Sequence, residues 1–337
     1  MVTRRATWWN EPARPALPKV KVALKIDVDT WRGTELGVPR LLDALRRHGA
    51  RATFLFSLGP DHTGRAIKRV FRPGFFGKVA RTSIVEHYGV KTLLYGTLLP
   101  GPDIGRRAAP LMRAVRDAGH EVGIHTWDHV KWQDGVGTNE DHASNAWTER
   151  QMTLACARFE EIFGTPAKTH GAAGWQMNPH AIRLTQRLGF DYCTDMRGTH
   201  PFVPVVNAEV TRCPQLPTTL PTLDELIGID GLTSENVHER VLRESDTAVP
   251  HGNVYTLHAE LEGLKLLPVF ERLLTAWRAR GDELVATGDI AAGLAIDDLP
   301  RHQVRWATVP GRSGALCPRG AGRRSGPSTL RRARPVS

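Results

Sequence analysis

Three short motifs carry residue types that can bind a metal ion or move a proton. The motif IDVD contains Asp27 and Asp29, HTWDH contains His125 and His129, and His258 stands in the block TLHAELEG. Two imidazoles four residues apart can share one side of a helical turn, and one carboxylate completes a three-ligand divalent site with positions left for water and substrate. The remaining carboxylate and imidazole suit acid–base catalysis.

Each motif alone also has a simpler interpretation. An aspartate pair can belong to a loop in which one residue caps the next segment. Two histidines four apart occur by chance on a surface, and a single histidine at a strand end is usually structural. All three motifs, however, fall at the carboxyl ends of predicted strands, where catalytic residues gather in α/β barrels. The combination therefore predicts one site.

The predicted site gives each residue a role. The expected metal ligands are Asp29, His125 and His129, the expected base that takes a proton from water is Asp27, and the expected acid for the leaving group is His258. Two imidazoles and one carboxylate suit Zn²⁺, with Co²⁺, Mn²⁺, Fe²⁺ or Ni²⁺ as alternatives. We therefore expect one divalent metal ion as cofactor.

Strand-like and helix-like stretches alternate around these motifs. Strands are predicted at 20–26, 52–57, 121–126, 167–170, 190–194, 252–258 and 283–286. Helices are predicted at about 38–48, 106–118, 141–163, 179–188 and 265–280. Strands interleaved with helices indicate an α/β fold with a parallel sheet, and this number of units favours closure into a barrel.

Composition excludes several classes of protein. The 337 residues are 41% hydrophobic and 24% charged, unlike fibrous or wholly disordered chains. No stretch approaches the roughly 18 apolar residues of a membrane span, and the first residues lack the apolar core of a secretory signal, so we expect a cytoplasmic protein. Four widely spaced cysteines without a C-x-x-C pair predict reduced thiols rather than a disulfide framework.

The net charge of +10 is located mainly in one terminal segment. Residues 301–337 contain nine arginines and no acidic residue, which leaves +1 for residues 1–300. Because the body of the chain is almost neutral, we expect no nucleic-acid partner. We predict a loose arm at 1–19, one catalytic domain at 20–300, and a disordered arginine-rich tail at 301–337.

The motifs IDVD and HTWDH and the strand-end His258 resemble those of the metal-dependent polysaccharide deacetylases, the NodB-homology group. The resemblance implies a distorted barrel of (β/α) units and the same roles for the five residues. Further blocks between about residue 20 and about residue 295 resemble one branch of this group: LKIDVDTWRGTELGVPRLL, FSLGPDHTGR, HEVGIHTWDHVKWQ, AAGWQMNP, TDMRG, LPTTLPTLDELIG and VYTLHAELEG. That branch removes formate from an amino sugar linked to undecaprenyl phosphate, which implies a role in lipid A modification and polymyxin resistance.

One block departs from the broad family. Typical members have an arginine that orients the base, whereas the stretch HGAAGW at 170–175 contains none. We expect Asp195 and Arg197 to supply the support instead, with Arg197 as a surface ion pair the alternative. Trp175 and Glu260 are predicted to support the site or contact substrate.

Residues 61–101 combine seven basic residues and two acidic ones with interleaved aromatics. This pattern is typical of an element lying on anionic lipid. We expect contact with the inner face of the cytoplasmic membrane through Lys68, Arg69, Phe71, Arg72, Phe75 and Phe76. The alternative is a helical insertion that packs its phenylalanines into the barrel.

Two other functions remain open from the sequence. One is an N-deacetylase of another amino-sugar substrate, such as peptidoglycan or a chitin-like oligosaccharide. The expected cytoplasmic location argues against it, because those substrates are mostly extracellular. The other is a non-catalytic protein that binds membranes or nucleic acid through its basic segments, which leaves the five strand-end residues without explanation.

Overall fold

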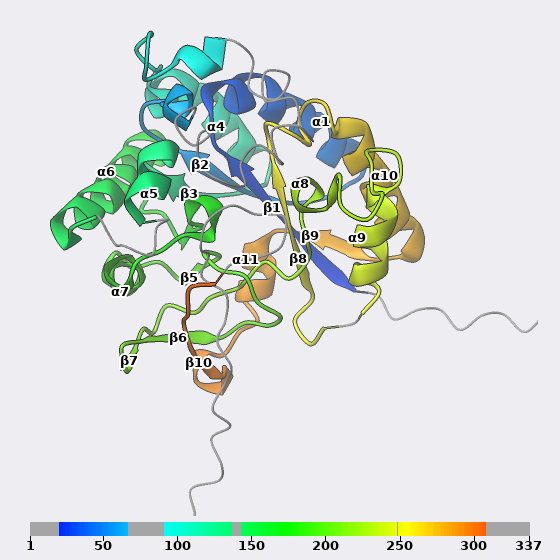
Figure 1. The fold of residues 1–337 in the computed structure, drawn as a ribbon. Coiled ribbons are helices and arrows are strands. Elements are labelled where there is room, and N and C mark those ends of the chain that lie inside the picture. Colours follow the sequence, from blue (N-terminus) through cyan, green and yellow to red (C-terminus); the bar gives the residue numbers. More distant parts are fainter. Residues whose placement is uncertain (1–19, 67–90, 137–142, 248, 308–337) are drawn as a thin grey trace, which may run out of the picture.

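The structure is a computed structural model that describes residues 20–66, 91–136, 143–247 and 249–307. In this part of the chain, seven strands form one parallel sheet at the centre of the molecule (Figure 1). The strands are β1 (Lys21–Val28), β2 (Thr53–Ser57), β3 (Glu121–Thr126), β4 (Thr169–His170), β5 (Tyr192–Cys193), β8 (Asn253–His258) and β9 (Glu283–Val285). Their order is β5-β4-β3-β2-β1-β8, and β9 also pairs with β1.

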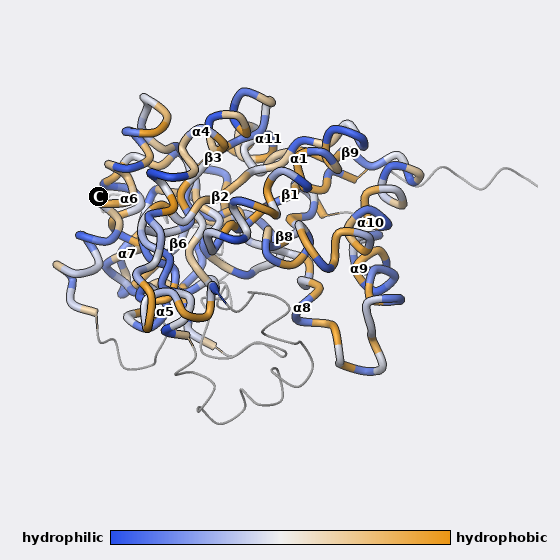
Figure 2. The backbone as a smooth tube through the Cα atoms, turned by 90° about the horizontal axis from the view of Figure 1, so that it is seen from above, coloured by the Kyte–Doolittle hydropathy of each residue, from blue (hydrophilic) through white to orange (hydrophobic). Residues whose placement is uncertain are grey.

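Helices cover the outside of this sheet. They are α1 (Val38–Arg47), α4 (Ile104–Asp117), α5 (His129–Val136), α6 (Asn145–Phe163), α7 (Pro179–Arg187), α8 (Leu223–Leu226), α9 (Val237–Ser245), α10 (Leu267–Arg280) and α11 (Thr287–Ala291). In both views, α6 and α7 lie on one side of the central strands, and α9 and α10 lie on the other (Figures 1 and 2). None of the described helices combines the length and apolar character that crossing a membrane requires.

An irregular segment joins the two ends of the sheet. Leu216 N donates to the Cys193 carbonyl of β5 at 2.8 Å, and Leu220 N donates to the Val254 carbonyl of β8 at 3.2 Å. The parallel sheet is thereby curled into the distorted barrel that the sequence predicted, with residues 214–220 in place of a regular strand. The predicted α/β class is confirmed.

Helix ends coincide with residues that satisfy free backbone groups. The side chains of Asp103, Ser144 and Asn178 accept hydrogen bonds from the first turns of α4, α6 and α7. Gly164 and Gly281 end α6 and α10 in the left-handed conformation. The cap at Ser144 explains why α6 begins at residue 145, later than the predicted 141.

Strand β1 is buried on both faces, which the alternating sequence did not predict. Its residues from Val22 to Val28 are all buried, including Lys25 with no exposed surface. Central strands of parallel barrels have one face against the helices and the other inside the barrel, so a polar residue can point inward. The interior of this barrel is therefore partly charged.

A second, smaller sheet was missed. It contains β6 (Val203–Val206), β7 (Glu209–Val210) and β10 (Arg301–Gln303), and β10 runs parallel to β6. Residues 301–303, which the sequence predicts to belong to the tail, form β10 in the structure. His302 is buried against the ring of Phe202 at 5.6 Å, while Arg301 and Gln303 are exposed. Three residues are too few for a periodic signal inside an arginine-rich stretch.

Candidate metal centre and active site

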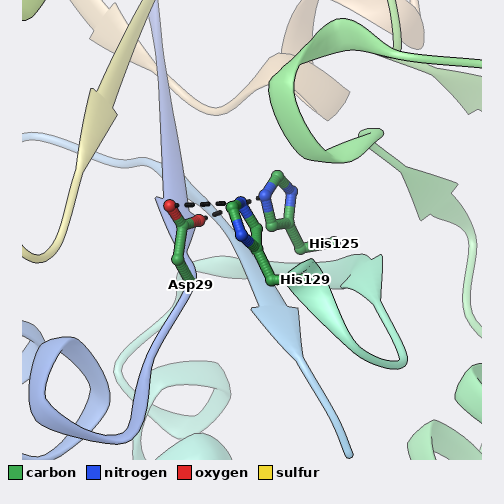
Figure 3. A group of neighbouring side chains, drawn as sticks. All are labelled: Asp29, His125 and His129. Carbon is green, nitrogen blue, oxygen red and sulfur yellow. Dashed lines mark ion pairs between the residues drawn. The ribbon is translucent and has the colours of Figure 1, made fainter. Parts of the chain in front are cut away.

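The predicted ligands come together at the carboxyl ends of β1 and β3. Asp29 follows β1, His125 lies in β3, and His129 is the first residue of α5. Their side chains point toward one another (Figure 3). Asp29 Oδ1 is 3.1 Å from His125 Nε2, and Asp29 Oδ2 is 3.3 Å from His129 Nε2. The turn from strand to helix is what brings the two imidazoles onto one side.

The three side chains fit a divalent metal ion. One donor atom from each lies within 4.8 Å of the other two. His125 Nδ1 donates to the Gly171 carbonyl at 2.6 Å, so the neutral ring keeps its lone pair on Nε2, which faces Asp29. Asp29 Oδ1 is buried and makes no well-formed hydrogen bond with the residues that the structure describes. These are the properties expected of donors oriented toward a cation.

The electrostatics of the group agree with that fit. Burial raises the pKa of Asp29, but the neighbouring imidazoles, His129 first, outweigh burial and hold this pKa far below its usual range. Burial lowers the pKa of His125, yet Asp27 and Asp29 leave it raised above its ordinary value. Asp29 therefore remains ionised beside His125 and His129, the two residues that would bind the same cation.

Glu260 holds the backbone that carries Asp29. Its Oε1 accepts hydrogen bonds from Asp29 N at 3.1 Å, and from Thr30 N and Thr30 Oγ1 at 2.8 Å each. A Cβ at Gly33 would lie only 1.9 Å from the same Oε1, so a glycine is needed for this close approach. Glu260 thus holds the backbone of the Asp29 loop, and the functional role that the sequence predicts for it stays a prediction.

Asp27 lies beside the group of ligands. It is buried, its Oδ2 accepts a hydrogen bond from Lys25 Nζ at 2.7 Å, and its Oδ1 lies 3.8 Å from His125 Nδ1. Oδ1 accepts no hydrogen bond from the described residues. A buried carboxylate with one oxygen engaged and the other open is suited to accept a proton from a bound water.

His258 faces the site from the neighbouring strand. It is the Cα partner of Asp27 in the pairing of β1 with β8. Its Nδ1 is buried and makes no hydrogen bond within the described part of the chain. Its backbone N–H donates to Glu262 Oε2 at 2.8 Å, which fixes the end of the strand. The pairing register therefore places an imidazole and a carboxylate at the same level of the barrel.

Glu262 gives the fold a testable dependence on pH. Burial raises its pKa from 4.5 to about 8. Between these two values the unfolded chain releases a proton that the folded chain retains, so stability falls as pH rises from 4.5 to 8. The difference corresponds to at most about 5 kcal/mol. We expect Glu262→Gln to lose less stability than the wild type between pH 5 and pH 8, measured by urea unfolding.

The control for this prediction is Glu160→Gln, on the exposed face of α6. This variant should keep the pH dependence of the wild type. If Glu262→Gln and Glu160→Gln lose the same free energy of unfolding over that pH range, Glu262 does not cause the loss.

Asp195 and Arg197 have other partners than the base. Asp195 Oδ1 accepts from Ala172 N at 2.9 Å and lies 2.6 Å from His170 Nδ1. Arg197 forms an ion pair with Glu225 at 3.2 Å and lies over the Trp175 ring at 5.0 Å. Lys25 is the cation in contact with Asp27, and the support that the sequence predicts from Asp195 and Arg197 stays a prediction.

A second group of potential ligands contains His170, Cys193 and Asp195. The 2.6 Å between His170 and Asp195 is a hydrogen-bond distance. Burial raises the pKa of the Cys193 thiol far above its ordinary value, which disfavours the thiolate that a metal requires. This group is therefore a hydrogen-bonded brace for the segment after β4.

Sequence reasoning missed Lys25, Gly171 and Glu262. The signal for Lys25 was a lysine two residues before Asp27 within a strand, since such residues share one face. The expected membrane residues Lys68, Arg69, Phe71, Arg72, Phe75 and Phe76 lie outside the described residues. So do the arm at 1–19 and the part of the tail at 308–337.

Comparison with known proteins agrees with the fold and the motifs. The family model of polysaccharide deacetylases matches residues 15–193. A protein of Shewanella sediminis (strain HAW-EB3), named "Probable 4-deoxy-4-formamido-L-arabinose-phosphoundecaprenol deformylase ArnD", is 38% identical over 297 residues, which cover 88% of this chain and 93% of that protein. A protein of the same name from Wigglesworthia glossinidia brevipalpis is 31% identical over 284 residues, or 84% of this chain and 96% of that protein.

Solved structures include a similar fold. A structure described as a polysaccharide deacetylase from Mycobacterium smegmatis superposes with a TM-score of 0.57 at 18% identity, covering 91% of this chain and 99% of that one. This likeness concerns the fold alone. The family match and the two relatives lead to one conclusion: the chain belongs to the polysaccharide deacetylase family.

Proposed function

We propose that this chain is a metal-dependent amide hydrolase. Its proposed substrate is 4-deoxy-4-formamido-L-arabinose linked to undecaprenyl phosphate, and its products are formate and the 4-amino sugar used in lipid A modification. The observation that carries the reaction is the placement of two aspartates and three histidines at the carboxyl ends of β1, β3 and β8 in one sheet. The substrate rests on the names of two relatives that match more than four fifths of the chain.

Asp29, His125 and His129 are the proposed ligands of one divalent metal ion. When bound, such an ion polarises a carbonyl oxygen and acidifies water. Zn²⁺ suits the donor set, with Co²⁺, Mn²⁺, Fe²⁺ or Ni²⁺ as alternatives. The hydrogen bond from His125 to Gly171 and the contacts of Glu260 with the Asp29 loop hold the donors in place.

Asp27 and His258 perform the two proton transfers in this proposal. Asp27 Oδ1 takes a proton from the water whose oxygen bonds to the formyl carbon. His258, in its protonated form, donates a proton to the amide nitrogen as the carbon–nitrogen bond breaks. An unprotonated amine anion is a very poor leaving group, so the acid is as necessary as the base. The products are formate and a free amine.

We also propose peripheral contact with anionic lipid, because a polyprenyl tail remains in the bilayer. The basic and aromatic composition of 61–101 supports it, as do three exposed leucines: Leu36, Leu98 and Leu99. Flotation with phosphatidylglycerol vesicles tests this contact, with phosphatidylcholine vesicles as the control. Equal flotation with both lipids, or with neither, contradicts an anionic contact.

The decisive experiment is a formate assay on purified protein. The Zn²⁺-loaded chain is incubated with undecaprenyl-phosphate-linked formamidoarabinose, and formate is measured with and without a chelator. We expect formate release that the chelator abolishes and added Zn²⁺ restores. A parallel assay replaces the formyl group with acetyl. Acetate release without formate release would favour an N-deacetylase, and chelator-resistant formate release would contradict the metal site.

A further inference from the structure

We propose that Lys25 is the positioning residue of the base Asp27, and that the Trp175 ring holds Lys25 in place. The inference rests on the proposed hydrolase function, in which Asp27 is the base. It concerns a residue that lies in the barrel interior, beneath the predicted site.

The contact between Lys25 and Asp27 selects one carboxylate oxygen. The two residues lie on the same face of β1, because side chains two apart in a strand point the same way. Lys25 Nζ binds Asp27 Oδ2 at 2.7 Å, and both side chains are buried. Among the residues that the structure describes, none donates a hydrogen bond to Oδ1, which lies on the side of His125. Lys25 therefore determines that Oδ1, and not Oδ2, is the Asp27 oxygen that can accept a proton.

A buried ammonium group needs compensation, since removing it from water is costly. Asp27 supplies the opposite charge, and the Trp175 ring supplies a π face with its centroid 5.3 Å from Lys25 Nζ. Cation–π contacts of this kind contribute more when both groups are desolvated. Lys25 is thus fixed between a carboxylate and a ring.

Two contacts, with Thr218 and with Arg197, hold Trp175 in place. Its indole N–H donates to Thr218 Oγ1 at 3.0 Å, and Thr218 is hydrogen-bonded to Thr256 of β8 at 2.7 Å. The guanidinium of Arg197 also lies over its ring. Its φ of 54° is in the left-handed region, which is uncommon for a large side chain. Such strained residues persist where the surrounding structure holds them and often mark functional sites.

Gly171 provides the space for Lys25. A Cβ at Gly171 would lie 3.0 Å from Lys25 Cε and 2.3 Å from Leu55 Cδ1. Its carbonyl also orients His125. The segment 170–175 therefore provides space for Lys25 at Gly171, a carbonyl that binds His125, and the Trp175 ring. The positive charge comes from Lys25 of β1. Asp27 therefore has a cationic partner, Lys25, although residues 170–175 contain no arginine.

The test compares two substitutions of Lys25 on the full-length, Zn²⁺-loaded protein. Lys25→Met keeps the volume and removes the charge, whereas Lys25→Arg keeps the charge. We expect Lys25→Met to lower kcat for formate release by roughly 10- to 100-fold, the size of effect that a misplaced catalytic group causes. KM and bound zinc should stay within about twofold of the wild type, and Lys25→Arg should recover part of the kcat.

Crystal structures of the zinc-loaded wild type and Lys25→Met give a measurement independent of activity. We expect the Asp27 carboxylate to rotate away from its wild-type position in Lys25→Met. Unchanged kcat in Lys25→Met would overturn the proposal, and so would an unmoved Asp27 or equal losses in Lys25→Met and Lys25→Arg. If Lys25→Met does not fold, Lys25→Gln, which also removes the charge, replaces it with the same expected results.

The two proposals fail in different ways. If the wild type releases no formate from the proposed substrate, the proposed function fails, while the position of Asp27 in Lys25→Met still tests the role of Lys25. If the wild type is active and Lys25→Met is equally active, the function stands and the role of Lys25 is rejected.

Discussion

Replacing Asp27 with asparagine is expected to lower kcat for formate release by roughly 10²- to 10⁴-fold, because general base catalysis contributes about that much. An amide of nearly the same volume cannot accept the proton from water. Asp27 is not one of the three proposed ligands, so the variant should still bind one Zn²⁺ per chain. Steady-state formate assays and metal analysis of the purified variant measure both quantities.

The matched control for this variant is Asp43→Asn on α1, where Asp43 forms exposed ion pairs with Arg46 and Arg47. It should keep both kcat and zinc. An active Asp27→Asn enzyme would exclude Asp27 as the base. Loss of zinc from Asp27→Asn would instead make Asp27 a ligand.

The corresponding substitution at Asp29, two residues later, should weaken metal binding. Asp29→Asn removes the proposed carboxylate ligand, and we expect the affinity for Zn²⁺ to fall by at least roughly 100-fold, since outer partners of ligands alone change affinity by about 10- to 100-fold. The rise in Tm on adding zinc should disappear with it, because a ligand stabilises only the fold that binds it. Chelator competition and thermal unfolding with and without zinc test this.

Two outcomes would contradict the assignment of Asp29. One is an Asp29→Asn protein whose zinc affinity equals that of the wild type. The other is a zinc-dependent rise in Tm that survives both in Asp29→Asn and in His125→Ala, since the ion would then bind elsewhere. Because Asp27→Asn and Asp29→Asn carry the same chemical change in one segment, their opposite effects on zinc separate base from ligand.

The sequence predicted the alternating strands and helices of the barrel. Each strand with a clear apolar run and a glycine or polar boundary has its counterpart in the barrel, as β1 to β5, β8 or β9. The sequence could predict that the five residues form one site, because the carboxyl ends of parallel strands meet at one edge of the sheet. Their roles remain predictions that the substitutions above test.

What the sequence did not reveal depends on tertiary contacts. The alternation in β1 indicated a polar face without saying that this face is the barrel interior, so Lys25 was overlooked. The segment 214–220 joins β5 to β8 without strand periodicity, and β10 has only three residues. Arg197 forms its ion pair with Glu225, 28 residues further on, a contact that its own motif does not reveal.

The pairing of β1 with β8 has a consequence for how the protein is made. All three proposed ligands have been synthesised once the ribosome reaches His129. Glu260, which holds the Asp29 loop, is 231 residues beyond Asp29. At roughly 5–20 residues per second, the segment between them takes roughly 10–50 s to translate. During that time one edge of β1 is unpaired, and open edges attract other chains. The nascent chain thus contains the three proposed ligands before the proposed acid, and the edge of β1 that pairs with β8 stays open until β8 emerges.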